Sequence, residues 1–260
     1  MCTSILDDPA ALAEVISDTN AASAPADPTL LSDIATANRI LFREGVVDAF
    51  GHVSARHDKH PDRFLLARNM APALVTDSDI VTFDFDGRAF DAQGRGVYLE
   101  RFIHAEIYRA RPDVMAVVHS HSAAVVPFGI VKNLPFRAVC HMGGFIGICA
   151  PIFEIRDVAG DETDLLIRNS MLGAALAKSL GDSNVVLMRG HGSTVIGNRL
   201  RQAVFRAVYT ENNARLQAEG LRLGPITYLS EGEARTTARV IDMQVDRAWD
   251  LWKMQAEGKI

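Results

Sequence analysis

The sequence predicts an α/β protein with a mixed sheet between helical layers. Short apolar runs rich in β-branched residues alternate with segments of helical periodicity along the chain. No internal repeat occurs, and no linker divides residues 30–260. The hydrophobic fraction of 48% and the charged fraction of 23% are those of an ordinary globular protein. With 260 residues, the chain is long enough for one large domain or two small ones.

The N-terminal region differs in composition from the rest of the chain. Residues 1–28 are rich in Ala, Asp and Pro, and end in Ala-Pro-Ala-Asp-Pro. This composition is typical of a short helix plus a linker, or of a mobile arm. We therefore expect an N-terminal arm over residues 1–28 and the folded domain over residues 29–260.

The first elements of this domain follow from local patterns. Apolar residues recur at helical spacing from Leu30 to Glu44, and Gly45 stands where a helix C-cap favours glycine. Two strands are predicted next, over residues 50–56 and 63–67. A third apolar run, residues 80–85, leads into Asp86-Gly87, which is typical of a hairpin turn.

The second half of the chain continues the alternation of strands and helices. Further strands are predicted at 114–118, 185–188 and 193–196, and further helices at 98–109, 123–131 (which contains Pro127), 172–180, 200–220 and from Ser230 past Trp252. The last helix is expected to start with a capping box formed by Ser230 and Glu233.

Histidines follow two of the predicted strands. His119 and His121 end the run at 114–118, and side chains at i and i+2 of a strand point to the same face. The pair can bind one metal ion, or it can be two hydrogen-bonded histidines at a strand end. His191 follows the strand at 185–188 and is flanked by glycines, which allow a close approach to a ligand. Glu100 opens the helix before the His-x-His strand, and can complement the helix dipole or act as a general acid or base.

Charge and composition exclude several classes of partner. The net charge is −5 with basic and acidic residues interspersed, so nothing suggests nucleic-acid binding. No apolar run approaches the roughly 18 residues of a membrane span. The first residues lack the features of a signal peptide, and the three cysteines show no Cys-x-x-Cys spacing. We expect a cytoplasmic enzyme with a small-molecule substrate.

Several motifs together resemble the class II aldolase/adducin family, across roughly residues 30–229. The motifs are Gly51-His52-Val53-Ser54, Glu100, Arg111-Pro112-Asp113, Val117-Val118-His119-Ser120-His121 and Arg189-Gly190-His191-Gly192. The resemblance implies a three-layer αβα sandwich with a mixed, largely antiparallel sheet, and a cyclic homotetramer with metal sites near the subunit interfaces. It also implies that His119, His121 and His191 bind a divalent ion, Zn²⁺ or Mn²⁺ with Co²⁺ possible, and that Glu100 is the catalytic acid/base or a further ligand.

The chain departs from the sugar-phosphate aldolases of this family where they bind phosphate. His52 and Tyr98-Leu99 stand where those enzymes have an Asn and a Ser-Ser pair, and residues 66–72 replace their phosphate loop. We expect a bulkier, more planar pocket, with Gly51, Ser54, Arg68 and Asn69 at the substrate. Arg68 is suited to bidentate binding of a carboxylate.

These departures resemble the decarboxylase branch of the family. The resemblance implies a metal-dependent decarboxylase of a hydroxylated aromatic or ring-cleavage carboxylate, such as a dihydroxyphthalate. His141 falls about where the aldolases carry a proton donor contributed across the interface, so His141 or His52 is expected to handle the proton. The alternatives are an aldolase or epimerase on a small hydroxy-carbonyl substrate, and a non-catalytic adducin-like module.

Overall fold

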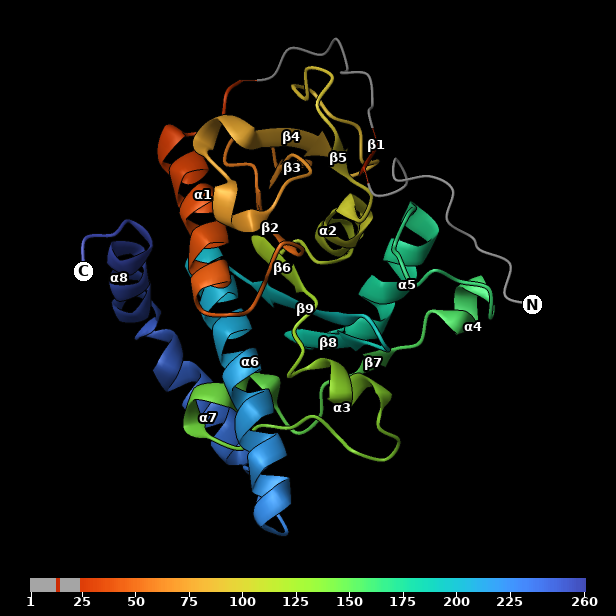
Figure 1. Cartoon of the computed structure of the whole chain (residues 1–260), viewed down its shortest axis with the longest axis vertical. Coiled ribbons are helices and arrows are strands. Elements are labelled where there is room, and N and C mark those ends of the chain that lie inside the picture. The colour runs from red at the N-terminus through yellow and green to blue at the C-terminus, as the bar shows by residue number, and fades with distance from the viewer. Residues whose placement is uncertain (1–12, 15–23) are drawn as a thin grey trace.

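The computed structural model of the chain describes residues 13–14 and 24–260. Most of the expected N-terminal arm lies outside these residues. The helices are α1 (Pro28–Arg43), α2 (Arg101–Ala110), α3 (Val126–Ile130), α4 (Arg156–Ala159), α5 (Ser170–Leu180), α6 (Leu200–Leu223), α7 (Glu231–Asp242) and α8 (Val245–Ala256), with short 3-10 helices η2 (Pro72–Leu74), η3 (Asp77–Asp79) and η4 (His141–Ile146) (Figure 1). The strands are β1 (Ala13–Glu14), β2 (His52–Arg56), β3 (Arg63–Ala67), β4 (Ile80–Asp84), β5 (Val97–Tyr98), β6 (Ala116–Ser120), β7 (Ile152–Phe153), β8 (Val185–Met188) and β9 (Gly192–Gly197).

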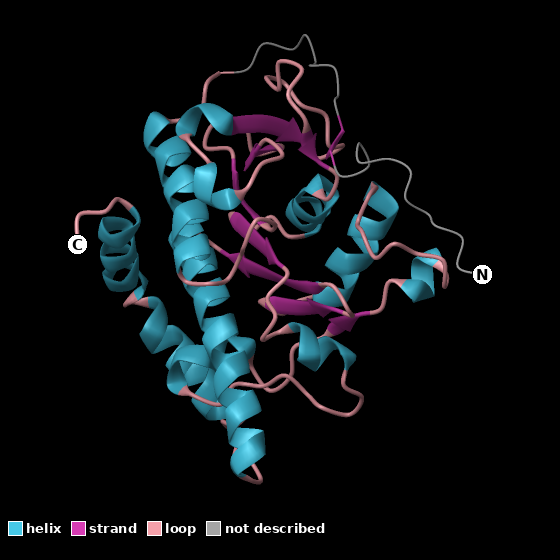
Figure 2. Cartoon of the chain, in the orientation of Figure 1, coloured by secondary structure: helices cyan, strands magenta, loops and turns pink. Residues whose placement is uncertain are grey.

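A seven-stranded sheet forms the centre of the molecule, in the order β4-β3-β2-β6-β9-β8-β7. The β7–β8 pair is parallel and the other neighbouring pairs are antiparallel. Helices lie on both sides of the strands, with α1 and α6 packed together on one side and α2 and α5 packed together on the other (Figure 2). The expected sandwich with a mixed, largely antiparallel sheet is therefore confirmed.

Three predicted helices differ in extent from the prediction. The helix expected at 98–109 begins at Arg101, because Val97 and Tyr98 pair with β1 as strand β5. The helix expected at 123–131 is reduced to α3, which has Pro127 in its first turn, where proline is tolerated. The single helix expected from Ser230 past Trp252 is two helices, because the Gln244 N–H turns back to the Ile241 carbonyl and ends the regular ladder.

The middle of the sheet is buried and places the functional residues. All five residues of β6 are buried between its neighbours β2 and β9. Antiparallel register sets His52 of β2 opposite His119, and His119 opposite Thr194 of β9. In the described part of the chain, no helix is both long and apolar enough to cross a membrane.

Candidate metal centre and active-site pocket

The end of β6 brings His119 and His121 together. His119 is fully buried inside the strand, whereas His121 follows its last residue and is part-exposed. Their Nε2 atoms lie 3.0 Å apart. The i, i+2 spacing thus places two imidazole nitrogens on one side of the sheet, as the sequence predicts.

His191 reaches the same point from the tight turn between β8 and β9. Its Nε2 lies 3.0 Å from Nε2 of His121. Gly190 has a positive φ of 67°, and a Cβ at Gly192 would lie 2.0 Å from the Ser120 carbonyl oxygen. Both flanking glycines are therefore required for the turn to approach β6 closely.

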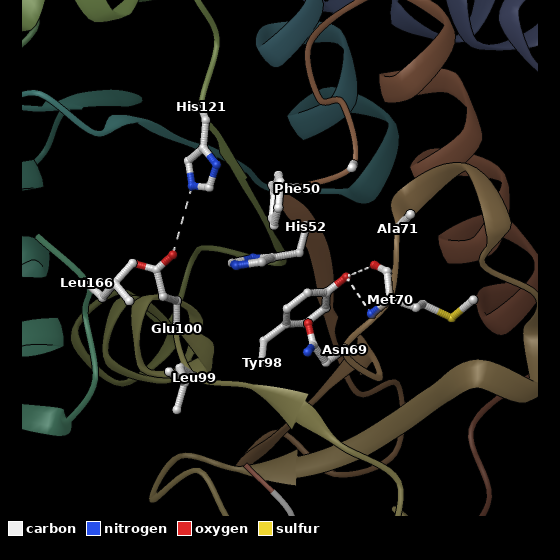
Figure 3. A pocket seen from close by; sticks show the side chains of 12 residues that line it. Phe50, His52, Asn69, Met70, Ala71, Tyr98, Leu99, Glu100, His121 and Leu166 are labelled. Atoms are coloured by element: carbon white, nitrogen blue, oxygen red, sulfur yellow. Dashed lines mark hydrogen bonds and ion pairs between the residues drawn. The ribbon is translucent and has the colours of Figure 1, made fainter. Parts of the chain in front are cut away.

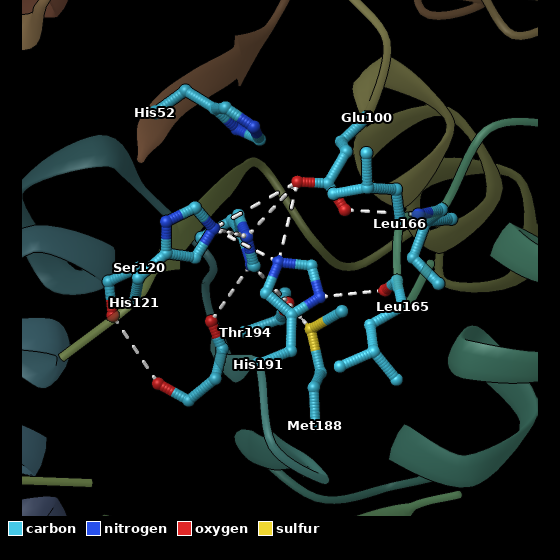
Figure 4. A network of polar contacts seen from close by, with 12 residues as sticks. His52, Glu100, Ser120, His121, Leu165, Leu166, Met188, His191 and Thr194 are labelled. Carbon is cyan, nitrogen blue, oxygen red and sulfur yellow. Dashed lines mark hydrogen bonds and ion pairs between the residues drawn. The ribbon is translucent and has the colours of Figure 1, made fainter. Parts of the chain in front are cut away.

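Glu100 stands at the N-cap of α2 and completes the cluster. Its Oε1 accepts a hydrogen bond of 3.0 Å from the Ile167 backbone N–H. Its Oε2 lies 3.5 Å from Nε2 of both His119 and His191 and 4.0 Å from Nε2 of His121 (Figure 4). The ligand atoms of these four side chains all lie within 4.8 Å of one another. The structure therefore brings together all four residues expected at the metal.

The protonation of the cluster fits a divalent cation. Nδ1 of His119 lies 3.1 Å from the Ser193 carbonyl and Nδ1 of His191 lies 2.9 Å from the Leu165 carbonyl. Because a carbonyl only accepts, these Nδ1 atoms carry the protons, and the Nε2 lone pairs face the centre. Burial and the neighbouring imidazoles lower the pKa of His121 to about 3, which keeps it neutral. Imidazoles with converging lone pairs, together with a carboxylate, form a donor set for Zn²⁺ or Mn²⁺.

Glu100 is the anionic member of this set. Burial opposes its ionisation, but the adjacent His119 and His191 hold the pKa of Glu100 well below its usual value. The same contact acts on His191: burial disfavours its charged form, yet the Glu100 carboxylate 3.5 Å away raises the pKa of His191. A buried carboxylate among imidazoles is thus ionised and available to bind a cation.

A cavity of about 290 Å³ adjoins the cluster (Figure 3). It is lined by Ala49, Phe50, Gly51, His52, Asn69, Met70, Ala71, Tyr98, Leu99, Glu100, His121 and Leu166. Among the residues that the structure describes, no lysine or arginine lines this cavity. Most of its lining residues are apolar, and Glu100, His121 and the His52 ring lie together on one side of it.

Gly51 has a local role in shaping this cavity. Its φ is +95°, and a Cβ at this position would lie 2.7 Å from Val47 Cγ1 and 3.0 Å from the His119 carbonyl oxygen. Only glycine tolerates both the conformation and the contact. Gly51 lets the chain enter β2 directly beside His119.

The other expected site residues are distributed unevenly. His52 and Asn69 line the cavity with Gly51. Arg68 does not, because its guanidinium Nε lies 2.7 Å from Asp79 Oδ1. Ser54 is fully buried and its hydroxyl contacts other side chains, so the structure does not bring it to the cavity either.

His141 lies outside this pocket within a single chain. It begins η4, is exposed, and lines a different cavity of about 630 Å³ with Phe205 and Tyr209. Its expected role across a subunit interface therefore stays a prediction.

The fold adds residues to the site that the sequence motifs did not indicate. Tyr98 lines the cavity, its hydroxyl donates to the Met70 carbonyl, and burial raises the pKa of Tyr98 to about 12. His104 and Tyr108 are buried below the cavity and contact Ser54. A signal for both was present, because residues 100, 104 and 108 are spaced by four and share one face of α2.

Comparison with known proteins assigns the family. Residues 32–218 match the family model described as the class II aldolase and adducin N-terminal domain. The chain belongs to the class II aldolase/adducin family. This membership agrees with the sandwich fold and with the histidine and glutamate cluster.

Relatives within the class II aldolase/adducin family carry decarboxylase names. The chain is 39% identical over 241 residues to Decarboxylase tropJ of Talaromyces stipitatus, across 84% of this chain and 90% of that protein. It is 33% identical over 196 residues to the 3,4-dihydroxyphthalate decarboxylase of Arthrobacter keyseri, across 72% of this chain and 76% of that protein. These relatives and the family support a lyase.

Solved structures of the family show the same fold. The L-fuculose 1-phosphate aldolase of Glaciozyma antarctica superposes with a TM-score of 0.72 at 19% identity, across 91% of this chain and 96% of that one. At this identity the likeness concerns the architecture alone.

Proposed function

We propose that this protein is a metal-dependent decarboxylase of a hydroxylated aromatic or ring-cleavage carboxylate, such as a dihydroxyphthalate. One observation carries the proposal: a cluster of three histidines and a glutamate opens onto a largely apolar cavity. A flat ring fits apolar walls, and a hydroxyl and a carboxylate fit the polar end. The decarboxylase names of the relatives support this reading.

His119, His121 and His191 would hold the metal ion, with Glu100 as a further ligand when substrate is absent. A divalent ion there (Zn²⁺ or Mn²⁺, with Co²⁺ also compatible) would polarise the substrate hydroxyl and carboxylate oxygens and stabilise the negative charge that develops as CO2 leaves. The apolar side chains of Phe50, Met70 and Leu166 line the cavity and exclude water from the ring.

Glu100 is the residue that we propose to move the proton. It is ionised in the free enzyme, so it accepts the proton of the substrate hydroxyl. When the bond to the carboxylate breaks, its electron pair stays on the carbon, and Glu100 returns a proton to that carbon. Glu100 Oε2 faces the cluster at the cavity, which is where both transfers must occur. His52 contacts the substrate from the adjoining wall.

We also propose that the enzyme works as a homotetramer. Family membership favours this assembly, and the exposed position of His141 leaves it free to act on a neighbouring subunit's site. His141 would then be a second group that handles a proton. The mass of the protein in solution tests the tetramer. The activity of a mixture of His141→Ala and Glu100→Gln subunits tests whether His141 acts on a neighbouring subunit's site.

The function is tested by CO2 release in the presence of Mn²⁺ or Zn²⁺. The panel is 3,4-dihydroxyphthalate, a hydroxypyridine dicarboxylate and a carboxylated hydroxymuconic semialdehyde. We expect metal-dependent CO2 release from one of them, and none from the His121→Ala variant. Silence across the panel with bound metal confirmed would instead favour carbon–carbon cleavage to an aldehyde, as in an aldolase. The pocket argues against a sugar phosphate, because His52 and Tyr98-Leu99 stand where the sugar-phosphate aldolases of the family have their phosphate-binding Asn and Ser-Ser pair.

A further inference from the structure

A chain of four buried polar side chains leads away from the cavity below His52. Nδ1 of His52 lies 2.6 Å from Nε2 of His104, and Nδ1 of His104 lies 2.6 Å from Ser54 Oγ. Ser54 Oγ lies 2.7 Å from the Tyr108 hydroxyl. The last three residues are almost completely inaccessible, so each polar atom depends on its neighbour in the chain.

The contacts of the Tyr108 hydroxyl show the direction of these hydrogen bonds. In the described part of the chain, Ser54 Oγ is the only acceptor within hydrogen-bonding distance of the Tyr108 hydroxyl. Burial raises the pKa of Tyr108, and a hydrogen bond from the Val117 backbone acts in the opposite direction, as a donating N–H does. The Tyr108 hydroxyl therefore donates to Ser54, because otherwise a buried O–H would have no acceptor.

The donor of each remaining hydrogen bond follows from the one before it. Ser54 accepts from Tyr108, so its own proton goes to Nδ1 of His104. His104 then carries its proton on Nε2 and donates it to Nδ1 of His52. Both rings are neutral, because each accepts a hydrogen bond at Nδ1 and an imidazolium has no accepting nitrogen. A neutral His52 that accepts at Nδ1 carries its proton on Nε2.

We propose that Ser54 and His104 are positioning residues that hold His52 as a neutral imidazole protonated on Nε2. His52 then donates a hydrogen bond to an oxygen of the substrate. It acts neither as a base nor as a source of protons. Figure 3 shows the His52 ring directed towards Glu100 and His121, at the polar end of the cavity. The identity of the accepting oxygen rests on the proposed function, whereas the tautomer does not.

The same chain explains why His52 does not supply a proton. If Nε2 gave up its proton, the ring would recover one only through His104 and Ser54, and the charge would end on Tyr108. A buried phenolate is unfavourable, so the chain resists this transfer. A fixed neutral donor stabilises charge that develops on a substrate oxygen without reorganising. This assignment leaves proton transfer to Glu100 and, in the proposed tetramer, to His141 of a neighbouring subunit.

The tautomer is measured first, on the substrate-free protein with ¹⁵N-labelled histidine. Two-bond ¹H–¹⁵N correlations distinguish a protonated Nε2 from a protonated Nδ1, and the His52→Gln spectrum assigns the His52 signals. We expect His52 and His104 both to be protonated on Nε2. A proton on Nδ1 of His52 would overturn the proposal. Because no substrate is present, this result does not depend on the reaction.

Two hydroxyl deletions separate the relay from general packing. Ser54→Ala removes the group that sets the His104 tautomer, so the His52 signals should show a mixture of both tautomers. Tyr108→Phe removes a hydroxyl from the same network but leaves Ser54 to donate to His104, so the wild-type tautomer should persist. Equal spectra for the two variants would contradict the role of Ser54 as the group that sets the His104 tautomer.

Kinetics of two His52 variants test the donor role. Glutamine retains an N–H near the position of Nε2 but cannot relay a proton, whereas leucine has no donor. Replacing a fixed donor that stabilises an oxyanion costs about 10²–10³-fold in kcat, and we expect that loss for His52→Leu. For His52→Gln, the loss in kcat should be at least about ten times smaller than for His52→Leu. If both variants lose activity equally while the tautomer is as assigned, His52 transfers a proton and the donor role is wrong.

Discussion

His52 and His119 face each other across the β2–β6 ladder, with ring centroids 5.0 Å apart. One belongs to the wall of the cavity and the other to the metal cluster. A single antiparallel pairing therefore sets the distance between the cavity wall at His52 and the metal cluster at His119. A slip of β2 by one residue against β6 would turn His52 to the opposite face of the sheet and away from His119.

Gly51→Ala tests the close approach that fixes this register. The new Cβ would meet Val47 and the His119 carbonyl at 2.7 and 3.0 Å, with φ at +95°. We expect a loss of roughly 1–3 kcal/mol in the free energy of unfolding and lower metal content, because β2 must shift. Urea unfolding and metal analysis measure both.

The matched control is Gly94→Ala, which has a φ of +75° but no atom within 4 Å of the new Cβ. It carries the backbone strain alone. Equal destabilisation of the two variants, with metal retained in both, would mean that the contact with His119 is unimportant.

His121→Ala tests the metal site with little damage to the fold, because the His121 side chain is 32% exposed. We expect metal affinity to fall by more than the ~10–100-fold typical of residues that only orient a ligand, and activity to disappear. Circular dichroism should be unchanged. His60→Ala is the control, since His60 bonds the Ala24 backbone far from the cluster. Full activity of metal-free His121→Ala would refute the proposed mechanism.

Glu100→Gln separates catalysis from metal binding. Glutamine keeps an oxygen for the Ile167 N–H but loses the charge at Oε2 and cannot accept a proton. We expect kcat to fall about 10²–10⁴-fold, the usual contribution of a general acid or base. Bound metal should decrease less than in His121→Ala. A variant that loses metal fully but regains activity at high metal concentration would assign Glu100 only as a ligand.

The sequence predicts the metal centre better than the substrate pocket, for a physical reason. His119 and His121 stand at the end of β6, and His191 stands in the turn after β8. The local pattern that predicts each strand therefore also places its histidine. Ser54 shares a face with His52, yet α2 covers it with His104 and Tyr108, and no local pattern specifies which helix covers which strand. The same holds for Tyr98, whose pairing partner lies more than 80 residues away in sequence.

Arg68→Ala tests a role that the sequence suggested and the structure does not support. The guanidinium pairs with Asp79, whose second oxygen accepts hydrogen bonds from Thr76. We expect KM to change equally for a dicarboxylate and its monocarboxylate analogue, with a stability loss of at most about 1 kcal/mol for this part-exposed pair. Asp79→Asn, which removes the negative charge that pairs with Arg68, is the companion variant. A KM increase confined to the dicarboxylate would place Arg68 at the substrate.

Glu154 gives a pH-dependent prediction for the turn that carries His191. Its Oε2 lies 2.6 Å from Arg189 Nε and 2.7 Å from Arg156 in the structure. The hydrogen bond from Arg156, followed by that from Arg189, lowers the pKa of Glu154 from 4.5 to about 2. A lowered pKa means that the folded state favours the ionised form. Its contribution to stability is therefore present above pH 4.5 and is lost as the pH falls towards 2.

Glu154→Gln should remove this contribution and flatten the decline of the unfolding free energy between those two pH values. Urea unfolding of both proteins across this range measures the difference. Glu162→Gln, at an exposed loop position, is the control and should follow the wild type. At neutral pH, Glu154→Gln should also weaken metal binding, because Arg189 anchors the turn only two residues before His191. Parallel pH profiles for wild type and Glu154→Gln would show that the pair contributes nothing to the fold, and unchanged metal affinity would show that it does not position His191.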